Sequence, residues 1–130
     1  MNKIFIEAES FKQKGGWVVD TQSFEVIHSA YLMAHGAGVP VTDAVTDFAL
    51  ENSGKYSVWA LTRDWTAVWG AKDSAGKFNI KINGTLLPEI LGTNGKDWAW
   101  QKAGEIELLN GINQISLCDL TGFNGRVDAI

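Results

Sequence analysis

The sequence has little of what would mark a disulfide framework, a membrane span or a nucleic-acid surface. Its 130 residues include one cysteine, Cys118, so no internal disulfide can form, and the apolar neighbours of this residue predict a buried thiol. No apolar run approaches the ~20 residues of a membrane-spanning helix. Eleven lysines and arginines stand against fifteen acidic residues and form no stripe, so nucleic acid is not expected as a partner.

Signatures of catalysis are also missing. The sequence contains no nucleophile elbow, no triad signature and no glycine-rich phosphate loop that opens a helix. The two histidines, His28 and His35, have no cysteine or carboxylate at a zinc-like spacing and are expected to be structural or surface residues. We therefore do not expect an enzyme, and an independent lyase or hydrolase activity is the weakest of the functions considered.

What the sequence does contain is a succession of short alternating segments separated by glycine, asparagine and aspartate. There are fourteen glycines but only two prolines, and helical periodicity is almost absent. The pairs Asn83-Gly84 and Asn110-Gly111 predict tight turns, the second within the clearest hairpin pattern. The segments expected to form strands are residues 3–9, 24–27, 31–34, 44–50, 55–63, 77–82, 105–109, 112–120 and 125–130.

This succession predicts a single all-β domain over residues 1–130, and the last residues stop within a strand pattern, as in a domain cut from a longer protein. Without a βαβ rhythm the sheets should be antiparallel. We expect a two-sheet jelly-roll β-sandwich whose first and last strands are adjacent in one sheet. Same-face positions of the clearest strands should fill its core. They are Tyr56, Val58, Ala60, Phe78, Ile80, Ile82, Ile106, Leu108, Ile115 and Leu117.

Two acidic residues lie close together in the first expected strand. Glu7 and Glu9 are two positions apart, so in a strand their carboxylates would share one face. Like charges on one face repel unless a cation or hydrogen-bond donors lie there, and calcium prefers several hard oxygen ligands. Asp128, near the end of the last strand, would supply a third carboxylate. The alternative, two solvated carboxylates on an edge strand, stays open.

Two stretches that do not alternate carry four of the six tryptophans. Trp65 and Trp69 lie in residues 63–77, and Trp98 and Trp100 lie in residues 91–101. Flat rings can stack on the apolar faces of sugars, while sugar hydroxyls need charged or amide partners. Residues of that kind stand beside these rings, among them Arg63 and Asp64. The alternative, that the tryptophans fill the core or wedge loops together, stays open as well.

A third polar and glycine-rich stretch, residues 119–126, precedes the last strand. Within it, Asn124 and Arg126 would be suitable partners for hydroxyl or carboxylate groups. In a purely structural interpretation, Asn124-Gly125 forms a turn and Asp119 pairs with Arg126 across it. If a glycan site exists, we expect it where this stretch meets residues 63–77 and 91–101. The predicted ligand-binding residues are Arg63, Asp64, Trp65, Trp69, Trp98, Trp100, Asn124 and Arg126.

Several segments together resemble carbohydrate-binding modules of families 6 and 35. They are Glu7-Ala8-Glu9, Gly54-Lys55-Tyr56, Gly111-Ile112-Asn113-Gln114-Ile115 and Val127-Asp128-Ala129-Ile130. A closer likeness is to the β-sandwich module attached to bacterial xanthan-lyase-like proteins and FAD-dependent oxidoreductases. That likeness rests on Thr62-Arg63-Asp64-Trp65, Gly76-Lys77-Phe78, Trp98-Ala99-Trp100-Gln101 and Asp119-Leu120-Thr121-Gly122-Phe123.

The resemblance implies a galactose-binding-like jelly roll in a secreted or periplasmic protein, although the sequence starts without a signal-peptide pattern. It also implies a structural calcium ion, which would fall on Glu7, Glu9 and Asp128. The expected function is that of a non-catalytic, monomeric module that targets an attached enzyme to a polysaccharide. The alternative is an accessory domain that packs on its parent lyase or oxidoreductase and binds no sugar. The long tryptophan-rich stretch at residues 63–77 departs from the family pattern.

Overall fold

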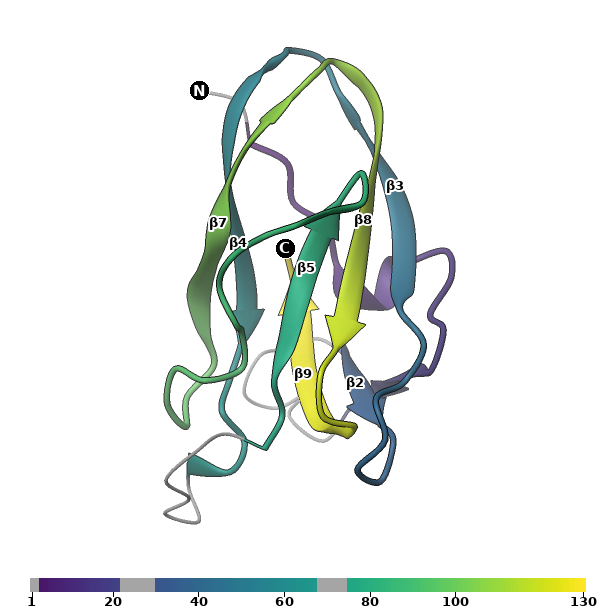
Figure 1. Cartoon of the computed structure of the whole chain (residues 1–130), viewed down its shortest axis with the longest axis vertical. Helices are drawn as coiled ribbons and strands as arrows, with labels where there is room; N and C mark the ends of the chain where they lie inside the picture. Colours follow the sequence, from purple (N-terminus) through teal and green to yellow (C-terminus); the bar gives the residue numbers. More distant parts are fainter. Residues whose placement is uncertain (1–2, 22–29, 68–74) are drawn as a thin grey trace.

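The computed structural model describes residues 3–21, 30–67 and 75–130, and it folds as two antiparallel sheets packed face to face (Figure 1). The five-stranded sheet has the order β1 (Trp17–Asp20), β2 (Tyr31–His35), β9 (Phe123–Ala129), β4 (Gly54–Thr62) and β7 (Ala99–Leu108). The four-stranded sheet has the order β3 (Ala44–Leu50), β8 (Gly111–Asp119), β5 (Phe78–Ile82) and β6 (Thr85–Leu86). The expected antiparallel β-sandwich is confirmed.

The two ends of the sandwich differ in how the chain connects the sheets. At the upper end in Figure 1, which we call the arch end, the connections β3–β4 and β7–β8 each cross from one sheet to the other. Asn110-Gly111 is therefore an arch between layers, and the hairpin expected there is wrong, because turn residues do not specify whether the strands they join will pair. Asn83-Gly84 does close a hairpin, between β5 and β6.

The lower end, which we call the loop end, carries the loops that follow β4 and β8 and the loop that precedes β7. Residues 24–27, expected as a strand, lie outside the described residues. β1 and β6 were not expected, and β7 begins at Ala99 rather than at Glu105. Within the described ranges, no helix has the length and hydrophobicity of a membrane span.

The N-terminal segment is adjacent to the last strand, as expected, but it is not a regular strand. Ile6 and Ile130 exchange two backbone hydrogen bonds of 2.9 Å, and Glu7 forms an isolated bridge with Ala129. The chain then turns into a single 3-10 helix, η1 (Ala8–Ser10), which places Ala8 in the core with 0% of its surface exposed. The strand predicted over residues 3–9 is thus wrong, because burial of Ala8 interrupts the alternation.

The core between the sheets contains the side chains that alternation predicted. Eight of the ten expected residues are buried, and the other two, Tyr56 and Ile106, pack half-buried against the same cluster. The sequence did not indicate that Phe11, Trp17 and Leu91 also belong to this core. Trp17 meets Phe78 edge to face with ring centroids 5.7 Å apart. The core is therefore continuous from β1 on one sheet to β5 on the other.

Candidate functional site

The outer face of the five-stranded sheet carries the residues that we consider as a site. Along β2, Leu32 and Ala34 belong to the core, so the alternation of a strand places Tyr31 on the outer face. Along β9, Val127 belongs to the core, and Arg126 accordingly lies on the same outer face. Loops from the loop end of the sandwich bring further aromatic residues to this face.

Four residues form what we call the aromatic–arginine cluster: Tyr31, Trp65, Trp98 and Arg126. The guanidinium carbon of Arg126 lies 6.0 Å from the ring centroid of Tyr31 and 5.4 Å from that of Trp65. The rings of Tyr31 and Trp98 are tilted by 58° with centroids 5.0 Å apart. The cluster joins β2, β9, the loop after β4 and the loop before β7, so only the folded chain assembles it.

Electrostatics make Arg126 an unusual arginine. Burial lowers the pKa of its guanidinium, and the positive charge of Arg63 lowers it further, while Tyr31 and Asp20 act in the opposite direction. The Nε atoms of Arg63 and Arg126 are both buried, and neither has a hydrogen-bond partner among the described residues. Because two guanidinium groups with available donors lie near each other, this face favours a ligand that is rich in oxygen or carries negative charge.

Tyr31 is a member of the site that sequence analysis missed. Its side chain is fully buried, its hydroxyl donates a hydrogen bond to the carboxylate of Asp20, and its ring contacts both Trp98 and Arg126. Nothing in the local sequence distinguishes it from a core residue, because a buried tyrosine in a strand usually faces the core. Only the partners of β2 in the sheet show that it faces outward.

Asp64 holds the chain in a turn instead of facing a ligand. The side chain is 7% exposed, and its Oδ1 accepts hydrogen bonds from the backbone N–H of Thr66 at 3.1 Å and from the Thr66 hydroxyl at 2.7 Å. Its own N–H donates to the carbonyl of Gly95 at 2.8 Å. This arrangement is an Asx turn that fixes the loop carrying Trp65. Among the described contacts, the predicted role of Asp64 as a ligand-binding residue has no support.

Trp65 itself lies against the backbone of a second loop. A Cβ atom added to Gly76 would come within 2.9 Å of the indole ring of Trp65, so this position requires glycine or a shift of the ring. Thr121 donates from its hydroxyl to the carbonyl of Ala75 at 2.5 Å. The stretches 63–77, 91–101 and 119–126 therefore meet at the loop end, as the sequence predicts. Trp69 lies outside the described residues.

Trp100 is placed apart from the aromatic–arginine cluster. It is 44% exposed on β7, and its ring meets that of Phe5 at 6.3 Å in an edge-to-face arrangement. Trp59 on the neighbouring strand β4 is equally exposed, and the ammonium group of Lys102 lies 6.0 Å from its ring. The expectation that Trp98 and Trp100 act at one site is not supported by these contacts, because β7 carries them in different surroundings.

Asn124 is part of β9 and does not form the expected turn. Its φ is 60°, and it is the extra residue of a bulge, since Ala34 pairs with Gly125 while His35 pairs with Phe123. The Oδ1 atom of Asn124 lies 2.7 Å from Nδ1 of His35. Asn124 therefore lies at the edge of the cluster, over β2, where it remains partly accessible.

Asp119 closes the loop that follows β8 and does not pair with Arg126. Its buried carboxylate accepts three backbone N–H groups: Val41 at 2.9 Å, Thr121 at 3.2 Å and Gly122 at 3.1 Å. A carboxylate that accepts this many backbone donors is satisfied without a cation. The ion pair expected between Asp119 and Arg126 is therefore wrong, and Arg126 keeps its charge for other partners.

The expected metal-binding residues do not form a group of three. No cluster of three or more histidine, cysteine or acidic side chains occurs in the part of the chain that the structure describes, which includes Glu7, Glu9 and Asp128. The reason is η1, which begins directly after the exposed Glu7 and removes Glu9 from the face that a strand would give it. Glu9 and Asp128 each have one buried carboxylate oxygen.

Cys118 is buried, as the sequence predicts. Its Sγ lies 3.5 Å from a carboxylate oxygen of Asp43, and burial together with that carboxylate raises the pKa of the thiol to about 11. At neutral pH the sulfur is therefore protonated and a weak nucleophile. It has no place in the site.

Comparison with known proteins supports the fold. No protein-family model and no curated protein matches the chain. A family 35 carbohydrate-binding module from Clostridium thermocellum matches with a TM-score of 0.71 and 18% identity, over 97% of this chain and 93% of that one. The C-terminal family 6 module of the laminarinase LamC from Zobellia galactanivorans matches with a TM-score of 0.66 and 17% identity, over 98% and 96% of the two chains.

A larger protein contains a similar domain. A cycloisomaltooligosaccharide glucanotransferase from a Paenibacillus species, complexed with cycloisomaltoheptaose, matches with a TM-score of 0.71 and 15% identity. The match covers 97% of this chain but only 17% of the glucanotransferase. At such identities the likeness is one of fold. The chain therefore has the β-sandwich fold of family 35 and family 6 carbohydrate-binding modules.

Proposed function

We propose that this protein is a non-catalytic carbohydrate-binding module and that the aromatic–arginine cluster is its glycan site. The observation that supports this most directly is the position of Arg126. A partly buried guanidinium lies between the rings of Tyr31 and Trp65 at the place where three loops meet. Aromatic faces stack on the C–H face of a sugar ring, while a guanidinium binds hydroxyl or carboxylate oxygens.

The residues suit a sugar that carries an acidic group. Arg63 and Arg126 bring two positive charges to one face, and each has a buried Nε donor that the described residues leave available. A carboxylate would satisfy both charges and offset their mutual repulsion. Binding should be weak, since a shallow site removes little surface from water. A dissociation constant between micromolar and millimolar corresponds to about 4–8 kcal/mol.

The alternative is an accessory domain that packs on a parent enzyme and binds no sugar. The half-burial of Trp65 and Trp98 is compatible with this role, because rings that wedge loops together are also partly covered. The two functions differ in what the guanidinium does. In a sugar-binding module, Arg126 contacts the ligand, whereas in an accessory domain its contribution is limited to stability.

The test compares binding and folding in the same variants. Arg126→Met keeps the length of the side chain but removes its donors, so it should lower affinity for acidic oligosaccharides at least about tenfold, or 1.4 kcal/mol. Trp59→Ala, on the same sheet but outside the cluster, is the matched control and should bind normally. Glycan binding is measured by calorimetry and folding by thermal denaturation. Unchanged binding by folded Arg126→Met would reject the cluster as the site.

We further propose that the module is a monomer that serves a polysaccharide-processing protein, exported to the cell exterior or the periplasm. Its resemblance to modules of xanthan-lyase-like proteins and FAD-dependent oxidoreductases suggests such a protein as the parent. In that setting the module would hold the catalytic domain near its polymer and raise the local substrate concentration. Activity of the parent on insoluble polymer, with and without residues 1–130, tests the targeting role.

Calcium remains a prediction. The three carboxylates named above do not act together, but buried oxygens of Glu9 and Asp128 are donors of the type that calcium prefers, alongside backbone carbonyls. If an ion binds there, addition of a chelator should lower the melting temperature, because a ligand that binds only the folded state stabilises it. An identical melting temperature in calcium and in chelator would reject the prediction.

A further inference from the structure

The arch end of the five-stranded sheet has a gap in its strand order. Strand β9 pairs with β4 at Leu61 and Thr62 only, whereas β4 pairs with β7 along its full length, Gly54–Thr62. Figure 1 shows the C-terminus about halfway up the sandwich, while β4 and β7 continue above it. The edge of β4 over residues 54–60 that faces away from β7 therefore has no partner strand among the described residues.

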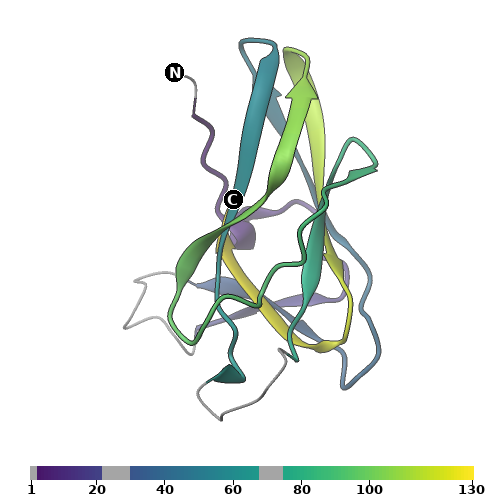
Figure 2. The same cartoon turned by 60° about the vertical axis from the view of Figure 1, so that its left-hand side comes forward.

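The N-terminal segment marks the opposite side of this gap. Ile6 pairs with Ile130 on the edge of β9 that faces away from β4, and residues 3–6 continue upward beside β4 in both views (Figures 1 and 2). Because each paired strand lies ~4.8 Å from its neighbour, two backbones that flank the line of β9 are ~9.6 Å apart. The space above Ile130 is therefore one strand wide.

A groove of about 810 Å³ occupies this space, and we call it the strand slot. Its walls are consecutive residues, 3–6 on one side and 53–59 on the other, with Ile130 at the lower end. Consecutive residues line a groove when a strand presents its edge, since a strand that presents a face contributes every second residue. The floor comes from Phe48, Leu50, Ile82 and Ile115 of the opposite sheet.

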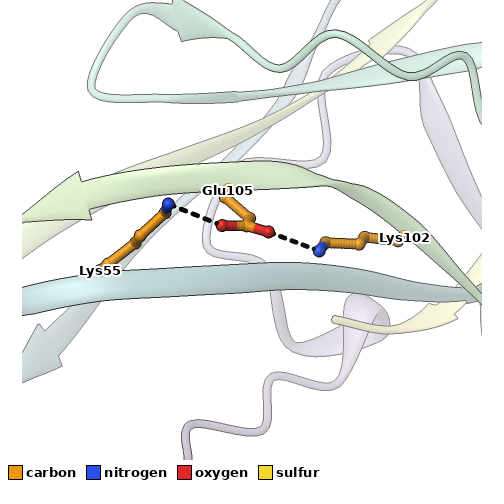
Figure 3. Close-up of polar contacts among 3 residues, drawn as sticks. All are labelled: Lys55, Lys102 and Glu105. Atoms are coloured by element: carbon orange, nitrogen blue, oxygen red, sulfur yellow. Dashed lines mark hydrogen bonds and ion pairs between the residues drawn. The ribbon is translucent and has the colours of Figure 1, made fainter.

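The strand β4 is well prepared to accept a partner. Its other edge is fixed to β7 by the complete ladder and by Lys55, which forms an ion pair of 3.0 Å with Glu105 of β7 (Figure 3). Glu105 in turn pairs with Lys102 at 2.7 Å. An edge strand held in this way presents ordered N–H and C=O groups, which is the arrangement that β-augmentation uses.

We propose that the strand slot binds one extended peptide strand from a partner protein, antiparallel to β4. The chemistry of the slot specifies the peptide. Apolar side chains at every second position would contact Phe48 and Ile115, and the positions between them would lie near the exposed rings of Phe5 and Trp59. A strand antiparallel to β4 runs in the direction of β9, so its C-terminal end lies at the level of Lys3 and favours an acidic residue.

The first experiment uses a synthetic peptide of alternating threonine and valine with a C-terminal glutamate. Amide exchange of the isotope-labelled protein is measured by NMR as the peptide is added. Alternate amides within residues 54–60, those that face the slot, should exchange at least about tenfold more slowly at saturation. A peptide of the same composition with its valines in one block is the control. Equal protection by both peptides, or no protection by the alternating one, overturns the proposal.

The second experiment changes the floor of the slot. Phe48→Glu introduces a charge beneath the bound strand and should abolish protection by the peptide, while Val39→Glu, at a 68% exposed apolar residue outside the slot, should not. Glycan binding by Phe48→Glu reports whether the loop end remains folded. If the same β4 amides become protected as protein concentration rises without peptide, the occupant is a second copy of this chain, and the assignment to a partner protein is wrong.

Discussion

At the loop end, β9 lies between β2 and β4, and every strand of the five-stranded sheet has its neighbours. At the arch end, the same sheet loses β9 above Ile130, and the core is exposed to a groove between β4 and the N-terminal segment. Phe78 at the loop end is fully buried, whereas Phe48 on the floor of the slot is only half-buried. Completion of the sheet, rather than the type of residue, therefore decides how well each half of the core is sealed.

The largest expected effect compares these two phenylalanines directly. Phe78→Ala should cost ~3–5 kcal/mol of unfolding free energy, because it leaves a cavity in a closed core beside Trp17. Phe48→Ala should cost less than half as much, since solvent already reaches its surroundings. Urea denaturation measures both. Equal losses would mean that the arch end is as tightly packed as the loop end.

The second prediction concerns the loop closed by Asp119. Asp119→Ala removes a buried acceptor from three backbone N–H groups and should lower the free energy of unfolding by ~3 kcal/mol, since hydrogen bonds to charged groups contribute about 1.5–3 kcal/mol each but solvent replaces part of the loss. Asp97→Ala, at an exposed residue of a neighbouring loop, should change stability by less than about 0.5 kcal/mol. Similar effects of the two substitutions would contradict this role of Asp119.

The third prediction concerns the contact between Gly76 and Trp65. Gly76→Ala should destabilise the protein by ~1–3 kcal/mol, because the new methyl group displaces the indole ring. It should also weaken glycan binding, since Trp65 then moves away from Arg126. In a Trp65→Ala background the same substitution should cost less, and a double-mutant cycle measures that difference. Additive losses would show that the ring does not respond to the methyl group.

The smallest expected effect comes from the ion pairs on β4 and β7. Lys102 and Lys55 lower the pKa of Glu105 from its usual value near 4.5 to about 2. A carboxyl group with a lowered pKa stabilises the fold above the unfolded value, and this contribution disappears as pH falls through the folded value. It should be small, because all three side chains are exposed to solvent.

NMR titration of the side-chain carboxyl carbons tests this prediction. The carbon of Glu105 should titrate near pH 2 and that of Glu107 closer to the ordinary value. The melting temperature of Glu105→Gln should depend less on pH between about 5 and 2 than that of the unchanged protein. A Glu105 carboxyl that titrates near pH 4.5 would show that the ion pairs do not persist in solution.

The sequence alone was sufficient to predict the fold class and most of the core. Apolar and polar residues alternate in the strands that became β3, β4, β5 and β8, and period-two alternation directly encodes which face is buried. It was sufficient as well to predict that the stretches 63–77, 91–101 and 119–126 carry exposed or half-buried polar and aromatic residues. These inferences hold because they depend on neighbours along the chain.

Tertiary structure decided how these pieces combine. Asp64 and Asp119 became turn-forming residues because backbone donors happen to surround them, and no local pattern distinguishes such an aspartate from a ligand-binding one. Tyr31 joined Arg126 because β2 lies beside β9, although 95 positions separate the two residues in the sequence. The strand slot depends on where β9 ends relative to β4. Each of these outcomes depends on strand pairing between distant segments, and alternation within one segment carries no information about its partner.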